Sequence, residues 1–187
     1  MIDHSVITID DIIPDTEEIL RHQGIPRGAV VKDHIQELMR EAVEEFRKIA
    51  EPKCIMKEIS KSDFAKVFQG EGQNASDSPI MEIYEKADDL ALFAVTMGQV
   101  LSSRIQELFD QNDFARAAML DSCASMAADK AAGWLENYYS NYLTEHKRSA
   151  RNKLVFGYSP GYCGWNVSAQ RILFKYLQWS SLERIVL

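Results

Sequence analysis

The sequence has few cysteines and an excess of acidic residues, and both features exclude classes of protein. Its three cysteines, Cys54, Cys123 and Cys163, are far apart and odd in number. That pattern excludes a disulfide framework or a CxxC metal motif and favours a reducing compartment. Lysine and arginine number 21 against 28 aspartate and glutamate residues, a formal net charge of -7. A nucleic-acid surface would need clustered cations, so no nucleic-acid partner is expected.

Long hydrophobic runs are also lacking. No stretch approaches the roughly 20 apolar residues that span a bilayer, and the amino terminus has no basic region followed by an apolar stretch. We therefore expect a cytoplasmic protein that does not contact a membrane. With 187 residues, of which 46% are hydrophobic and 26% charged, the chain is large enough to bury one core. The prediction is a single domain over residues 1–187.

Hydrophobic periodicity predicts a succession of helices and strands. The predicted helices span residues 15–23, 31–50, 62–68, 79–87, 99–111, 113–145 and 168–177. The predicted strands span residues 6–9, 53–59, 90–96, 153–156 and 183–187. The run 90–96 is continuously apolar, which indicates a central strand, and a loop rich in turn-forming residues is expected at 70–79.

The longest predicted helix carries one stripe whose first half is small and whose second half is large. Its members are Ala117, Asp121, Ala124, Ala128, Ala131, Leu135, Tyr138 and Tyr142. Burying an unpaired carboxylate at Asp121 would cost several kcal/mol. Either Asp121 faces a partner or a polar cavity, or the buried face is turned away from this stripe. Asp129, two turns later and offset to one side, is either a solvated acid or an acid lining a ligand cleft.

The most distinctive segment is residues 156–165, which holds three glycines, a proline, a thiol and three aromatic rings besides Phe156. Glycine and proline bend the backbone and exclude a regular helix. Rings beside glycines leave amides exposed next to flat apolar faces, which suits a ligand that is partly polar and partly planar. The alternative is a structured turn whose aromatic residues merely pack beneath it.

Signatures of a self-contained catalytic site are missing. No Walker loop, Rossmann fingerprint or HExxH motif is present, and the histidines do not have metal-ligand spacing. Cys163 could be a reactive thiol, but no neighbouring cation activates it, and simple packing is the alternative. The sequence therefore favours a module that binds a cofactor or donor whose own atoms react.

Residues 158–165, with the following helix through Gln170 and Phe174, resemble the activation (reactivation) domain of cobalamin-dependent methionine synthase, in particular its free-standing anaerobic homologues. Weaker similarity extends over residues 25–29, 90–98 and 118–135. The resemblance implies an α+β fold, helix-rich and single-domain, in which several helices flank a twisted antiparallel sheet. Because related proteins continue beyond the position of Leu187, the C-terminal part of the family fold is expected to be missing.

The resemblance also implies a function. The family binds S-adenosylmethionine in a shallow groove and presents its methyl group to cobalamin carried by a methionine synthase or corrinoid protein. Flavodoxin or ferredoxin supplies the electron that makes the cobalt nucleophilic. The implied binding residues for the adenosine part are Ser159, Pro160, Gly161 and Tyr162. Asp129 stands where the family's long helix bears an acid, and no residue of this chain is expected to be catalytic or to bind a metal.

A rival interpretation belongs to another class of protein. Better-studied family members carry arginine at the position of Gly157, so an arginine contact is missing or is supplied elsewhere, for example by Arg151. The chain would then be a binding or scaffolding module that docks on a corrinoid protein without using S-adenosylmethionine.

Overall fold

The computed structural model describes residues 7–148 and 154–178, which form two compact units. One unit contains residues 54–94 and 156–178, and the other contains residues 7–53, 95–148 and 154–155. Both units bury hydrophobic side chains of their own.

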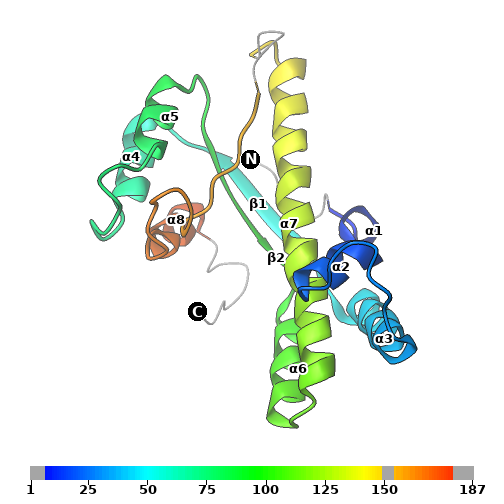
Figure 1. Ribbon diagram of the computed structural model, residues 1–187. Coiled ribbons are helices and arrows are strands. Elements are labelled where there is room, and N and C mark those ends of the chain that lie inside the picture. Colours follow the sequence, from blue (N-terminus) through cyan, green and yellow to red (C-terminus); the bar gives the residue numbers. More distant parts are fainter. Residues whose placement is uncertain (1–6, 149–153, 179–187) are drawn as a thin grey trace. The chain divides into compact units, whose positions relative to one another are not determined.

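The described residues hold eight helices and two strands (Figure 1). The helices are α1 (Ile9–Ile12), α2 (Thr16–His22), α3 (Asp33–Ile49), α4 (Lys61–Gln69), α5 (Ile80–Lys86), α6 (Gln99–Asp110), α7 (Phe114–Glu145) and α8 (Ala169–Leu177). The strands β1 (Lys53–Glu58) and β2 (Ala91–Thr96) pair into a two-stranded antiparallel sheet. This arrangement confirms the predicted helix-rich α+β fold.

The unit with the long helix is built around α7, against which α1, α2, α3 and α6 pack (Figure 1). Apolar residues recur every three or four positions along α3, and its inner face is buried at Leu38, Ala42 and Phe46. Neighbours on more than one side bury a wide face of α7. The buried residues of α7 are Ala117, Met119, Leu120, Ser122, Cys123, Ala127, Ala131, Leu135, Tyr139 and Leu143.

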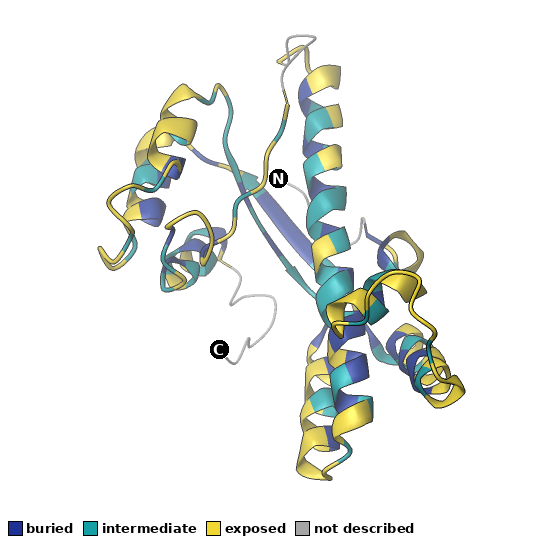
Figure 2. Ribbon diagram, in the orientation of Figure 1, coloured by how far each residue is buried: buried dark blue, intermediate teal, exposed yellow. Residues whose placement is uncertain are grey.

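The other unit combines most of the sheet with α4, α5 and α8. Helix α4 packs against α8, and its aromatic residues Phe64 and Phe68 lie in the core of the unit with Trp165. Gly70 ends α4 with a φ of 53°, and a Cβ at this position would lie 3.2 Å from the Cβ of Ala169. Glycine therefore lets the end of α4 approach the start of α8 closely. The inner residues of β1 are buried (Figure 2).

Two predicted strands were wrong over the residues that the structure describes. In the first, Ile9 begins α1, because the Asp11 carboxylate accepts hydrogen bonds from the backbone N–H and the hydroxyl of Thr8, at 2.9 and 2.7 Å. That local capping outweighs the weak alternation of residues 6–9. In the second, Leu154 and Phe156 lie in a segment without regular structure. The strand predicted at 183–187 lies outside the described residues.

Two other predictions need smaller corrections. The strand β2 is not central, because the sheet of the described residues has only one other strand. Helix α4 begins earlier than predicted, since Ser60 rather than Ser62 accepts the hydrogen bond from the backbone N–H of Asp63, at 3.1 Å. A serine at that position satisfies one of the free N–H groups of the first turn.

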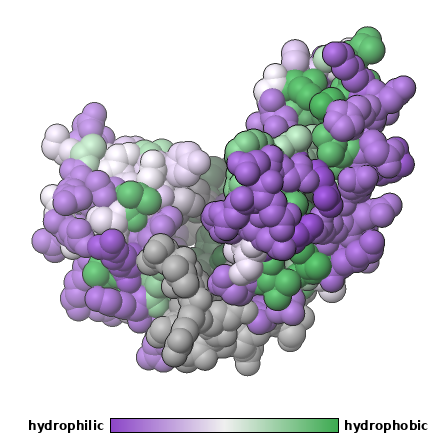
Figure 3. All heavy atoms as spheres, turned by 90° about the horizontal axis from the view of Figure 1, so that it is seen from below, coloured by the Kyte–Doolittle hydropathy of each residue, from purple (hydrophilic) through white to green (hydrophobic). Residues whose placement is uncertain are grey.

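The surface is mostly polar on the side shown in Figure 3, where hydrophobic residues form only small groups. Among the helices of residues 7–148 and 154–178, none is long and apolar enough to cross a bilayer.

Candidate functional site

The predicted binding residues form a tight turn. The backbone N–H of Tyr162 donates to the carbonyl of Ser159 at 3.1 Å. Pro160 takes the second position and Gly161 the third, with a φ of 105°. This is the residue pattern of a type II turn, which needs a positive φ at its third position. The Pro-Gly pair is thus explained by backbone geometry.

A second turn follows directly. The N–H of Trp165 donates to the carbonyl of Tyr162 at 2.9 Å, and both central residues have positive φ, 51° at Cys163 and 74° at Gly164. Two successive positive φ values are characteristic of a type I′ turn. The N–H of Gly161 donates back to the carbonyl of Trp165 at 2.6 Å. Residues 159–165 therefore form one compact unit of backbone, called here the double turn.

One side of the double turn is open. The Tyr162 residue is 71% exposed, and Ser159 is exposed as well. A Cβ added at Gly161 would have no atom within 4 Å. Pro160, in contrast, is buried. A ligand can therefore reach a free aromatic ring and an uncovered stretch of backbone at the same place.

The opposite side of the double turn is anchored in the core. Trp165 is only 3% exposed, and its ring lies 5.7 Å from that of Phe64 and 5.9 Å from that of Phe68, measured between centroids. Within the described residues its indole Nε1 makes no hydrogen bond. Trp165 thus packs beneath the turn, as the alternative interpretation expected, whereas Tyr162 does not. Ligand binding at this segment stays a prediction.

A loop that follows α4 holds the double turn from outside. The Ser78 hydroxyl donates to the carbonyl of Cys163 at 2.7 Å, and the N–H of Ala75 donates to the carbonyl of Gly164 at 2.9 Å. A Cβ at Gly164 would lie 2.9 Å from the Cβ of Ala75 and 3.1 Å from that of Ser78. The second turn can approach this loop because Gly164 has no side chain. We call residues 73–78 the clasp.

Asn74 extends the clasp toward α8. Its side-chain Oδ1 accepts from the N–H of Asn166 at 2.8 Å, and its Nδ2 donates to the carbonyl of Phe68 at 2.5 Å. The side chain of Asn166 in turn donates to the carbonyl of Gln73 at 3.3 Å. Composition predicts the loop but not this contact, because most of the groups involved are backbone N–H and carbonyl groups.

The other predicted site residue, Asp129, is exposed on α7 and makes no hydrogen bond or ion pair within the described residues. Asp129 and the double turn belong to different units, so the predicted cleft between α7 and the glycine-aromatic segment stays a prediction. Asp121 is exposed too. The face of α7 that is buried among the described residues therefore leaves Asp121 out, and a partner at Asp121 stays a prediction.

A histidine–serine pair in the α7 unit escapes sequence analysis. His22 Nδ1 lies 2.9 Å from the Ser122 hydroxyl, which also accepts from the Gln23 side chain at 2.5 Å. Ser122 is 1% exposed, and within the described residues no carboxylate hydrogen-bonds to His22. A buried hydroxyl without an oriented base is poorly suited to nucleophilic attack. The pair holds the end of α2 against α7.

The thiols divide into two buried and one exposed. Burial raises the pKa of the Cys54 thiol, and it raises the pKa of Cys123 to about 12. Both thiols are therefore inert at neutral pH. Cys163 is exposed in the double turn. Across residues 7–148 and 154–178, no group of three or more His, Cys, Asp or Glu side chains could hold a metal ion.

Comparison of the chain with models of known protein families, and with curated proteins, gave no match.

Proposed function

We propose that this protein is an accessory factor for the reductive reactivation of a corrinoid- or cobalamin-dependent methyltransferase, and that it binds S-adenosylmethionine as the methyl donor to cobalt. Its partner would be a cobalamin-binding methionine synthase or a corrinoid protein, with flavodoxin or ferredoxin as the electron donor. The proposal combines the sequence resemblance with one structural observation, which is the open side of the double turn.

The open side of the double turn suits the adenosine part of the donor. A free ring at Tyr162 can stack on a planar base, an interaction worth about 1–3 kcal/mol where aromatic residues stack on nucleobases. The uncovered backbone at Gly161 allows polar atoms of the ligand to approach the main chain, which a side chain would prevent. The exposed hydroxyl of Ser159 adds a donor and acceptor beside them.

The charged groups of the donor need a different partner. Its sulfonium and ammonium groups are cations, which favour a carboxylate or the face of an aromatic ring. Asp129 is assigned this role by the resemblance, and it is exposed, with no bond to any described residue. When bound, S-adenosylmethionine supplies an activated methyl group. This chain supplies orientation and electrostatic complementarity.

Titration calorimetry with S-adenosylmethionine tests the proposal. We expect measurable binding by the wild type and at least about fivefold weaker binding by Tyr162→Ala, the lower end of the stacking range. Phe114→Ala is the matched control. Phe114 is also aromatic and is 58% exposed, but it lies in the other unit. This control should bind like the wild type.

The result also separates the proposal from its rival. No heat and no thermal shift with millimolar ligand would contradict donor binding. If the same protein then formed a complex with a cobalamin-carrying protein in the absence of the donor, the docking module would be the better description. Gly157, which is exposed and offers no side chain to a ligand, is the feature that favours this second candidate.

A further inference from the structure

We infer that the clasp sets the conformation in which the double turn binds its ligand, and that Ser78 is a positioning residue for Tyr162. The identity of the ligand rests on the proposed function, whereas the structural part of the inference does not. The starting point is that Tyr162 is 71% exposed. A ring with so little packing of its own takes its position from the backbone that carries it.

That backbone is held from outside at two successive carbonyls. Ser78 donates its hydroxyl to the carbonyl of Cys163, and Ala75 donates its N–H to the carbonyl of Gly164. Each bond restrains the peptide plane that contains the bonded carbonyl, because the peptide unit is rigid. The two planes on either side of Gly164 are therefore both held. Since Tyr162 begins the same turn, the clasp also restrains the residue that carries the exposed ring.

The restraint matters because one of the residues it holds is in a conformation that side chains rarely adopt. Cys163 has a φ of 51° although it is not glycine. Such a conformation persists only where the surroundings over-determine it, and it is often found at sites that hold a ligand. Within the described residues, the hydroxyl of Ser78 is the side-chain group that bonds to the Cys163 carbonyl.

If Ser78 served only to stabilise the fold, removing its hydroxyl would lower the overall stability. The buried side of the double turn is anchored without Ser78, through the ring of Trp165 against α4 and through Asn74 bonded to the N–H of Asn166. Removal of the Ser78 hydroxyl should therefore leave this anchor intact. The second turn should loosen while overall stability changes little.

Cys163 provides a direct probe of this loosening. It is the exposed thiol among the three cysteines, since Cys54 and Cys123 are buried. A nitroxide spin label attached under native conditions therefore goes to Cys163, and its spectrum reports the mobility of the turn. We expect a more mobile spectrum in Ser78→Ala than in the wild type.

The experiment compares three variants of the clasp. Ser78→Ala should give the mobile spectrum and, on unlabelled protein, bind S-adenosylmethionine about two- to tenfold more weakly, as expected for one lost hydrogen bond. Ser78→Thr keeps the hydroxyl and should restore both properties. Ser76→Ala is the matched control, because Ser76 is exposed in the same loop and its side chain makes no hydrogen bond within the described residues. It should behave as wild type.

The outcomes separate this inference from the proposed function. An unchanged spectrum in Ser78→Ala overturns the inference, and so does a mobile spectrum with unchanged affinity. If the wild type binds no S-adenosylmethionine, the proposed function fails. The control of the double turn by the clasp is then decided by the spectra alone.

Discussion

Replacing Gly164 by alanine should destabilise the unit that contains the double turn by about 2–5 kcal/mol. One part of this cost is conformational, since Gly164 has a φ of 74° and a left-handed backbone costs a residue with a Cβ about 1–2 kcal/mol. The other part is steric. The new Cβ would lie 2.9 Å from the Cβ of Ala75, and overpacking of this kind costs about 1–3 kcal/mol.

A second glycine in the same segment separates the two costs. Gly161 has a φ of 105°, but a Cβ added there would have no atom within 4 Å. Gly161→Ala should therefore show the conformational cost alone, about 1–2 kcal/mol. The difference between the two variants measures the contact of the double turn with the clasp.

Urea unfolding followed by far-ultraviolet circular dichroism gives the free energies of unfolding of both variants. A double-mutant cycle then tests the steric part, because Ala75→Gly removes the atom closest to the added Cβ. Gly164→Ala should cost less in the Ala75→Gly background than in the wild type. Equal costs for Gly161→Ala and Gly164→Ala, with no coupling to Ala75, would refute the reasoning.

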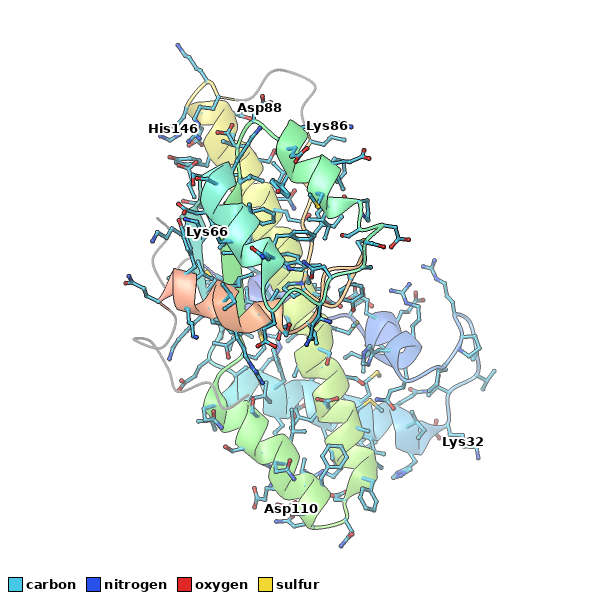
Figure 4. The ribbon with its side chains drawn as sticks, turned by 90° about the vertical axis from the view of Figure 1, so that its left-hand side faces the viewer. Lys32, Lys66, Lys86, Asp88, Asp110 and His146 are labelled. Carbon is cyan, nitrogen blue, oxygen red and sulfur yellow. The ribbon has the colours of Figure 1, made fainter. Side chains whose placement is uncertain are left out.

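Three further predictions concern other parts of the molecule. Gly133 lies in the interior of α7, where an added Cβ meets no atom within 4 Å. Gly133→Ala should therefore stabilise the protein by about 0.5–1 kcal/mol, and a lower free energy of unfolding in urea would contradict this. Lys66 projects from α4 (Figure 4), and its hydrogen bond holds the pKa of Asp63 below its usual 3.8. Ionised Asp63 therefore stabilises the fold above pH 3.8. This stabilisation is lost as the pH falls through the lowered pKa. Asp63→Asn should accordingly be less stable than the wild type at neutral pH, with a difference that shrinks in acid, and a pH-independent difference would count against the pair. Ser122→Ala should lower the free energy of unfolding by about 0.5–1.5 kcal/mol, because it removes the buried hydroxyl that accepts a hydrogen bond from the Gln23 side chain. An unchanged free energy of unfolding would show that the hydroxyl contributes nothing to stability.

The start of α2 was predictable, because a cap involves residues only three or four positions apart. Asp15 was expected to begin a helix, and its carboxylate accepts from the N–H of Glu18 at 2.8 Å, while Glu18 accepts from the N–H of Asp15 at 2.9 Å. The same locality explains the correction at α1. Thr8 and Asp11 have the spacing of a capping pair in the sequence, but a strand was predicted over residues 6–9.

The buried face of α7 was less predictable. The expected stripe shared Ala117, Ala131 and Leu135 with the buried residues, but it also contained Asp121, which is exposed. Most of the circumference of this helix carries apolar or small side chains of its own, so periodicity alone does not select one face. Helices packing from several sides select it instead, and they bury a face broader than a single stripe.

By itself, the sequence determined the positions of most helices, the α+β class through its resemblance, and the bent glycine-aromatic segment. Each of these depends on neighbouring residues or on a recognisable local pattern. Only the tertiary structure decided that the clasp holds the double turn, with Trp165 inside and Tyr162 exposed. The reason is physical: the clasp acts through backbone groups, one hydroxyl and the absence of a side chain at Gly164, and none of these marks its distant partner in the sequence.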